Sequence, residues 1–360
     1  MKNAGPVRGR LRRQEHKNMV YIAFAFSALL VILAGNRLAG YGDTLAAHTT
    51  LGHGLVGGIL IAGVTSLPEF SSSVSAAVIG APDIAFGNVY GSNAFNLMIL
   101  AIVDIAQGKG GLLQIVRESH ILTAMFGILL TGFSVLAIWL TPYGILEFQI
   151  GWISSYSVVL MGLYIFAVVI MMRYEGKSRT QLDDEIIDNE TVEAEKETDL
   201  PSKTLKHAIT GFAAMAVVIV LAGITLSITA DKIALATGLG QTFVGTLLVA
   251  GATSLPELVA SIAAIRIGAY DMAVGNVLGS NVFNIMILVV TDVAFVSGSV
   301  YQAVSLQHMI TAVAGIILSS VAVIGLFYRS QRTVFTVGWD SLAIMIGYVI
   351  MMYALFVTSI

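Results

Sequence analysis

Hydrophobic residues dominate the chain in long continuous runs, separated by short polar connections and by one longer polar stretch. A run of about 20 apolar residues is the length that an α-helix needs to cross the hydrocarbon core of a bilayer. The pattern therefore predicts an all-α membrane protein with ten transmembrane helices, at residues 19–40, 51–79, 83–106, 118–140, 150–172, 206–229, 239–266, 271–296, 305–328 and 334–358.

The second and third predicted helices recur as the seventh and eighth. Residues 63–100, GVTSLPEFSSSVSAAVIGAPDIAFGNVYGSNAFNLMIL, align without a gap with residues 251–288, GATSLPELVASIAAIRIGAYDMAVGNVLGSNVFNIMIL, and more than half of the paired positions are identical. Because an odd number of helices precedes the second half, that half would enter the membrane from the opposite side. The sequence thus predicts two inverted five-helix repeats with broken helices at a central site, the arrangement that places a substrate near the bilayer midplane.

Polar segments divide the chain around these repeats. We expect a basic N-terminal tail at 1–18, the first repeat at 19–172, an acidic linker at 173–204 and the second repeat at 205–360. The linker is too short and too polar to fold as a domain. It also lacks the ligand spacing of an EF-hand, so a solvated run of charge is a better interpretation than a regulatory calcium site.

The distribution of lysine and arginine predicts an orientation. If the N-terminus lies outside, the inward connections carry twelve basic residues, whereas the outward connections after the first helix carry only Lys232. Such an excess is typical of cytoplasmic loops. It predicts a cytoplasmic linker and two extracytoplasmic termini. The basic tail contradicts this pattern, and either contact with lipid headgroups or a true start at Met19 would account for it.

Composition excludes several classes of protein. The chain is 56% apolar and only 11% charged, whereas soluble domains carry about 25% charged residues. It contains no cysteine, which excludes a disulfide framework, a thiolate metal site and a thiol nucleophile. Beyond the short tail nothing indicates nucleic-acid binding, and we expect no cofactor, no obligate protein partner and no cleavable signal peptide.

Each repeat places one glutamate, Glu69 or Glu257, inside an apolar helix. An ionisable residue within a membrane is costly and by default indicates a functional site. The proline of each Thr-Ser-Leu-Pro-Glu motif removes a helical hydrogen bond and frees a backbone carbonyl, the kind of group that broken transporter helices use as an ion ligand. Hydroxyl groups stand one turn from each glutamate on the same helix face, at Thr65, Ser66, Thr253 and Ser254.

The third and eighth helices add a second motif, GNVxGSNxFN. Its serine and its last asparagine are four residues apart and share a helix face; they are Ser92 and Asn96, then Ser280 and Asn284. The combined set consists of carboxylate, amide, hydroxyl and carbonyl oxygens, which calcium or sodium prefers. A divalent ion would neutralise both carboxylates, and monovalent ions or protons could compete for the same oxygens. If the two kinds of ion cannot occupy the site together, their transport in opposite directions would be coupled.

Other polar residues of the repeats receive structural interpretations. The remaining motif asparagines are expected mainly to hold helix ends and loops together, although ligation is open; they are Asn88, Asn93, Asn276 and Asn281. Asp83 and Asp271 open helices and are expected to cap them. Asp104 and Asp292 either line an ion path or face the headgroups. The histidines lie near the predicted membrane edges and receive no role.

The doubled combination of TSLPE with GNVxGSNxFN, in inverted halves, resembles the alpha repeats of the cation/calcium antiporter superfamily, and prokaryotic sodium/calcium exchangers in particular. The resemblance implies calcium export driven by sodium entry, with the first and sixth helices sliding against the core. By position it implies the ligands Thr65, Ser66, Glu69, Ser92, Asn96, Thr253, Ser254, Glu257, Ser280 and Asn284, with backbone carbonyls near Ala62 and Ala250.

One position departs from the pattern of the family. Many sodium-driven and potassium-dependent members carry aspartate where this chain has Asn284. Its counterpart Asn96 is also an amide, so the predicted site holds two formal negative charges rather than three. This weakens the case for potassium transport and leaves proton coupling open.

We therefore expect a secondary active antiporter of a prokaryotic inner membrane, exchanging Ca²⁺ for Na⁺ by alternating access. The alternative is a proton-coupled antiporter for Ca²⁺ or another divalent cation. A passive cation channel is disfavoured by the broken repeat helices. An enzyme is not expected, because intramembrane aspartyl proteases use paired aspartates, whereas the carboxylates repeated here are glutamates, and the Gly-x-Gly-Asp match at residues 40–43 lies outside the repeated motifs.

Overall fold

The computed structural model describes residues 5–47, 63, 65–108, 111–145, 148–187, 202–329, 333–334 and 337–359. Most of these residues are helical. The α-helices are α1 (Gly5–Ala47), α3 (Leu67–Val78), α4 (Pro82–Gln107), α5 (Ser119–Leu140), α6 (Ser155–Ile187), α7 (Ser202–Thr237), α8 (Gln241–Val244), α9 (Ala250–Thr253), α10 (Leu255–Arg266), α11 (Tyr270–Ala294), α12 (Val300–Ala303), α13 (His308–Tyr328) and α14 (Trp339–Ser359).

Short elements connect the helices. Leu112–Gln114 and Thr141–Tyr143 form 3₁₀ turns, and Gly245–Val249 is a π-helical turn. Two small antiparallel hairpins each precede a long helix. Strands β1 (Gln149–Ile150) and β2 (Ile153–Ser154) lead into α6, and β3 (Thr333–Val334) and β4 (Val337–Gly338) lead into α14.

Within the described residues, eight helices are long and apolar enough to cross a membrane, and a ninth candidate is the bent pair formed by Gln241–Thr253 and Leu255–Arg266. They correspond to nine of the ten predicted spans. The other predicted span, 51–79, is described at residue 63 and from residue 65 onward, where α3 forms. The chain is therefore a helical membrane protein, and the complete ten-helix arrangement stays a prediction.

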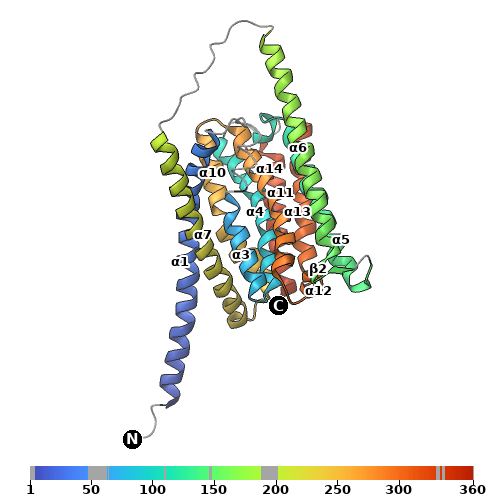
Figure 1. Cartoon of the computed structure of the whole chain (residues 1–360). Helices are drawn as coiled ribbons and strands as arrows, with labels where there is room; N and C mark the ends of the chain where they lie inside the picture. The colour runs from blue at the N-terminus through green and yellow to red at the C-terminus, as the bar shows by residue number, and fades with distance from the viewer. Residues whose placement is uncertain are drawn as a thin grey trace.

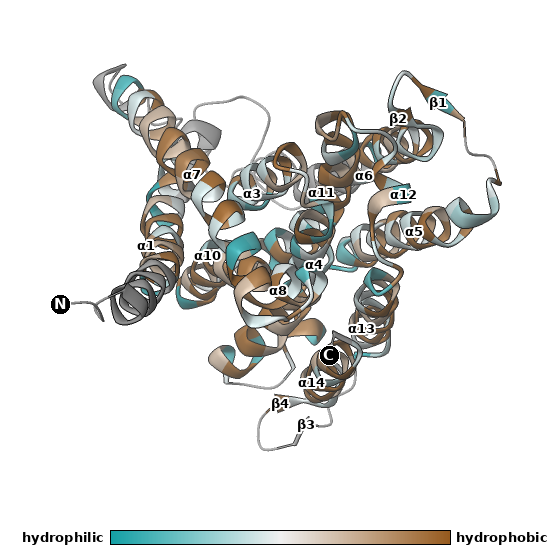
Figure 2. Cartoon of the chain, turned by 90° about the horizontal axis from the view of Figure 1, so that it is seen from below, coloured by the Kyte–Doolittle hydropathy of each residue, from teal (hydrophilic) through white to brown (hydrophobic). Residues whose placement is uncertain are grey.

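The helices stand roughly parallel in a bundle (Figure 1). Seen along the bundle, α1 and α7 form a pair at one side, and α3, α10, α4 and α11 lie between this pair and a group made of α5, α6, α13 and α14 (Figure 2). The repeated motifs are carried by the central helices. The site region therefore lies in the interior of the bundle, with α1 and α7 along one side of it.

Several helices extend further than the spans predicted for them; α7, for example, ends at Thr237 rather than at residue 229. Helix α1 begins at Gly5, within the predicted tail, and α6 continues to Ile187, within the predicted linker. Arginine, lysine, glutamine and glutamate have high helix propensity, so a polar segment that is rich in them can continue a helix beyond the apolar run. Hydropathy predicts the part that crosses the membrane rather than the end of the helix.

The span that carries the second Thr-Ser-Leu-Pro-Glu motif is broken. It runs through α8, the π-helical turn and α9, and it bends by 41° before α10. Pro256 lies near the start of α10 and cannot donate a helical hydrogen bond. Helix α4 packs closely against this broken segment through Gly91, because a Cβ atom there would lie only 2.6 Å from the carbonyl oxygen of Thr246. This close packing joins the two repeats.

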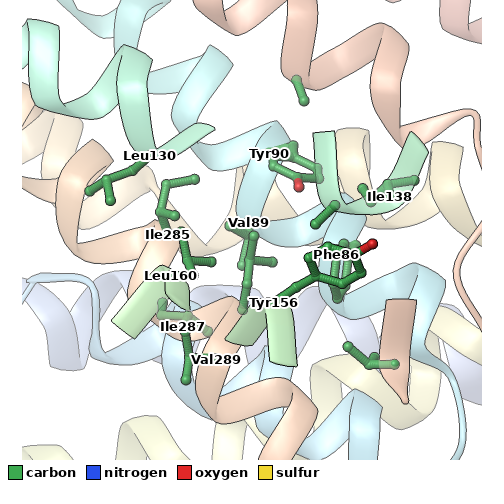
Figure 3. Packing of buried hydrophobic residues seen from close by; sticks show 14 of the residues in the cluster. Phe86, Val89, Tyr90, Leu130, Ile138, Tyr156, Leu160, Ile285, Ile287 and Val289 are labelled. Carbon is green, nitrogen blue, oxygen red and sulfur yellow. The ribbon is translucent and has the colours of Figure 1, made fainter. Parts of the chain in front are cut away.

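A cluster of buried apolar side chains fixes the central helices against the outer group (Figure 3). Phe86 and Tyr90 of α4 meet Ile138 of α5 and Tyr156 of α6 in this cluster. Between membrane helices such contacts stabilise mainly through van der Waals packing, because the lipid is as apolar as the interior. The hydroxyl group of Tyr90 is also satisfied, since it donates to Ser134 Oγ at 2.9 Å.

Candidate ion-binding site

The two glutamates occupy equivalent positions in the two repeats. Glu69 lies in the first turn of α3 and Glu257 in the first turn of α10, and each follows a proline at the start of its helix. Both side chains are fully buried. The other predicted ligands in the described residues are also buried; they are Thr65, Ser66, Ser92, Asn96, Ala250, Thr253, Ser254, Ser280 and Asn284. Ala62 lies outside the described residues.

Each carboxylate is held by a serine of the other repeat. Ser254 donates its hydroxyl hydrogen to Glu69 Oε1 at 2.8 Å, and Ser66 donates to Glu257 Oε1 at 3.2 Å. Ser92 adds a weaker contact to Glu69 Oε1 at 3.4 Å. The two motifs therefore form one site rather than two separate sites, because the broken helices exchange their hydroxyl donors.

The threonines of the two motifs make matching contacts. Thr65 donates to Asn276 Oδ1 at 3.2 Å, and Thr253 donates to Asn88 Oδ1 at 3.1 Å. Asn88 in turn donates to Ser73 Oγ at 2.9 Å. These amides thus bind the start of one repeat's broken helix to the core of the other, as expected for structural asparagines.

Four asparagines join α4 to α11 through reciprocal hydrogen bonds. Asn93 Nδ2 donates to the carbonyl oxygen of Asn281 at 3.1 Å, and Asn281 Nδ2 donates to the carbonyl oxygen of Asn93 at 3.2 Å. Asn96 Nδ2 donates to Asn281 Oδ1 at 2.9 Å, and Asn284 Nδ2 donates to Asn93 Oδ1 at 3.0 Å. We call these four residues the asparagine ring.

Five buried side-chain oxygens of the candidate site have no hydrogen-bond partner. They are Glu69 Oε2, Glu257 Oε2, Asn96 Oδ1, Asn284 Oδ1 and Ser280 Oγ. Buried polar atoms are nearly always paired, so a concentration of unpaired ones within one site requires an explanation. All five are oxygens, and four of them can act only as acceptors when the carboxylates are ionised. A bound cation would satisfy them together.

The charge of the site leads to the same conclusion. No ion pair found among the described residues includes Glu69 or Glu257. The described residues also contain no group of three or more histidine, cysteine, aspartate or glutamate side chains that could hold a metal. The site is therefore one of two carboxylates surrounded by neutral oxygens. Two buried anions without a basic partner would be strongly destabilising unless a bound cation or protons neutralise them.

The carbonyl group of Ala250, the predicted backbone ligand of the second repeat, already accepts a hydrogen bond within its own helix. Its oxygen accepts the backbone hydrogen bond of Ser254 at 3.0 Å. Thr253 Oγ1 lies 3.3 Å from the same oxygen, but its single hydrogen is shared with the shorter contact to Asn88. The role of the Ala250 carbonyl as an ion ligand stays a prediction.

The interpretation of Asp83 and Asp271 as helix caps is wrong. The N-cap positions of α4 and α11 are alanines that make no side-chain cap bond. Instead, each aspartate bonds a histidine of the other repeat; His308 Nε2 lies 2.9 Å from Asp83 Oδ1, and His120 Nε2 lies 3.0 Å from Asp271 Oδ1.

The two histidines were assigned no role from the sequence. They are separated by the same offset, 188 residues, as the paired glutamates, and this recurrence was the signal that could have identified them. Each lies at the start of its helix, α5 or α13. These contacts hold the start of α13 to α4 and the start of α5 to α11.

Asp104 and Asp292 do not face the headgroups. Both are buried, and each accepts backbone N–H groups from a following loop and from a hairpin. Asp292 accepts from Val300 N at 3.0 Å and from Ser154 N at 2.8 Å, while Asp104 accepts from Gly338 N at 2.9 Å. Their oxygens hold the hairpins that precede α6 and α14.

The chain is similar to several known proteins. A family model described as sodium/calcium exchanger protein matches residues 19–173 and 207–357. A membrane protein of Methanocaldococcus jannaschii is 30% identical over 245 residues, which are 68% of this chain and 71% of that protein.

Two solved structures share the fold at low sequence identity. One is the sodium-calcium exchanger NCX_Mj (TM-score 0.60, 23% identity, 94% of this chain and 99% of that one). The other is the H⁺/Ca²⁺ exchanger CAX (TM-score 0.67, 14% identity, 94% of this chain and 86% of that one). Since the family model covers most of both repeats, the chain belongs to the sodium/calcium exchanger family.

Proposed function

We propose that this chain exchanges Ca²⁺ for Na⁺ across a prokaryotic inner membrane, binding both ions in turn at the site of Glu69 and Glu257. The observation that carries the proposal is the set of five unpaired buried oxygens, which includes one oxygen of each carboxylate. Calcium binds six to eight oxygen ligands, several of them carboxylates, and so matches this set in chemistry and charge.

Sodium is the proposed counter-ion because the same oxygens suit it. Two monovalent cations would balance the two carboxylates that one calcium balances, so the occupancies exclude each other. Exclusive occupancy of one site that opens alternately to the two sides is sufficient for coupled antiport. Two protons would satisfy the same charge balance, which makes proton-coupled exchange the alternative.

Alternating access requires a part of the protein to move past the site. Helices α1 and α7 are the proposed moving elements, and their contacts with the broken helices support this. A Cβ atom at Gly35 of α1 would lie 2.6 Å from Cγ of Pro256, and one at Gly223 of α7 would lie 3.0 Å from Cβ of Ser71. The two glycines are 188 residues apart. Because neither has a side chain, α1 and α7 can each pack closely against a helix of the site.

The proposed orientation follows the distribution of basic residues. The linker would be cytoplasmic, and both termini would be extracytoplasmic. Asp83 and His308 would then lie toward the outside, and Asp271 and His120 toward the cytoplasm. Labelling of single cysteines introduced at residue 151 and at residue 190 with an impermeant reagent tests the orientation, since only the first should react from outside.

Uptake of radioactive calcium into proteoliposomes tests the proposed exchange. Vesicles are loaded with sodium and diluted into either choline or sodium buffer, with equal pH on both sides. We expect uptake that needs the outward sodium gradient and is absent in Glu69→Gln. Uptake that ignores sodium but follows an imposed pH gradient would support the proton-coupled alternative, and no uptake under either gradient would contradict calcium as the cargo.

A further inference from the structure

Two of the unpaired oxygens belong to amide groups, and an amide can present either its oxygen or its nitrogen to a cation. Asn96 and Asn284 present Oδ1, because their Nδ2 atoms are used as donors elsewhere. A rotation of either amide by 180° would place an NH₂ group beside the cation and replace an attraction by a repulsion. Something must therefore select one orientation.

We propose that Asn93 and Asn281 are positioning residues that fix the amide orientation of the two asparagine ligands in the opposite repeat. This inference rests on the proposed cation binding at the site. Asn93 Oδ1 accepts from Asn284 Nδ2, and Asn281 Oδ1 accepts from Asn96 Nδ2, at 3.0 and 2.9 Å. An acceptor at that place can be satisfied by NH₂ but not by the amide oxygen, so each contact selects the orientation that leaves Oδ1 unpaired.

The side-chain amides of Asn93 and Asn281 are themselves fixed in one orientation by backbone carbonyl groups. Each of them donates Nδ2 to the backbone carbonyl of the other, Asn93 to Asn281 and Asn281 to Asn93. A backbone carbonyl can only accept, so the NH₂ group must face it and Oδ1 must face the ligand amide. The backbone of α4 and α11 thus determines, through two hydrogen bonds in series, which atom of each ligand faces the cation.

The ring is buried on both sides, so water does not compete freely with these bonds. Asn96 and Asn284 are fully buried, and Asn93 and Asn281 are 6% and 5% exposed. A cavity of about 10 Å³ is lined from α4, α5, α11 and α13 by Asn93, Asn281 and side chains such as Thr131 and Thr311. A space of this size holds about one water molecule.

Each positioning asparagine bonds the ligand asparagine of the other repeat and not the one in its own repeat. This crossed pairing can be tested with double mutants. Asn93 acts on Asn284, and Asn281 acts on Asn96. Asn93→Leu keeps a similar side-chain volume but removes the acceptor. We expect it to weaken calcium binding about tenfold, measured by isothermal titration calorimetry on the full-length protein in detergent. In a protein that already carries Asn284→Ala, the same change should weaken binding less than twofold, because no amide is left to orient.

The matched control is the same change combined with Asn96→Ala. There the two effects should multiply, because the amide of Asn96 donates to Asn281 and not to Asn93. The mirror cycle uses Asn281→Leu. If Asn93→Leu multiplies equally with both alanine variants, Asn93 has only a packing role and the inference is overturned. Thermal melting without calcium checks folding, and Asn93→Ser replaces Asn93→Leu if the leucine variant does not fold. If the unsubstituted protein binds no calcium, the proposed function fails instead.

Discussion

Removing the charge of Glu257 should weaken cation binding without unfolding the protein. Glu257→Gln keeps the size of the side chain, and its amide oxygen can still accept the 3.2 Å bond from Ser66. What is lost is one of the two carboxylates that balance the cation. Loss of one member of a buried charge pair costs about 2–5 kcal/mol, which corresponds to about 30-fold to several thousand-fold in the dissociation constant.

The effect on stability should depend on calcium. At a calcium concentration 100 times its dissociation constant, binding stabilises the folded protein by about 2.7 kcal/mol. A 30-fold weaker site at the same concentration contributes only about 0.9 kcal/mol by the same relation. Without calcium the variant should be at least as stable as the unsubstituted protein, because a buried carboxylate without a basic partner has been removed.

Calorimetric titration and thermal melting, each with and without calcium, measure both effects. Glu118→Gln is the matched control, because Glu118 has a side chain that is 70% exposed and makes only a 3.7 Å contact with Arg329. It should leave calcium binding unchanged. A Glu257→Gln protein that binds calcium as tightly as the control, or that loses stability only in the absence of calcium, would refute the assignment of Glu257 to the cation site.

Two further predictions concern the supports of the site. Ser254→Ala should weaken calcium binding more than Ser92→Ala, by about tenfold against about threefold, because the bonds to Glu69 Oε1 are 2.8 and 3.4 Å long; equal effects in calorimetry would contradict the difference in distance. Gly91→Ala should lower the melting temperature by overpacking, at a cost of about 1–3 kcal/mol. The control Gly162→Ala has open space around the added methyl group and should be neutral or stabilising.

The membrane helices were well predicted because a segment that crosses the bilayer must be both apolar and helical, and hydropathy measures the first of these properties directly. The apolar runs at 83–106 and 118–140 correspond to α4 and α5 with ends that differ by one residue or not at all. Helix ends outside the membrane were less predictable. At the start of α1 and the end of α6 the sequence remains compatible with a helix, and hydropathy contains no signal for where it stops.

The types of residue in the candidate site could be predicted, but their partners could not. The spacing of Ser66 and Glu69 predicted that they share a helix face, but it did not predict that the serine donates to Glu257 of the other repeat. Spacing describes which residues share a helix face. It does not describe which face of another helix lies opposite, and this is why the histidine–aspartate contacts were also missed.

The crossed contacts have a consequence for how the site forms. An isolated repeat would contain one glutamate without the serine donor of the other repeat, and two asparagines of the ring without their amide partners in the other repeat. Each of these groups would be a buried polar atom without a partner, which is destabilising in a membrane. The hydrogen bonds that shape the cation site therefore also favour association of the two halves. Because these contacts are crossed, a substitution of a supporting residue in one repeat disturbs a ligand of the other.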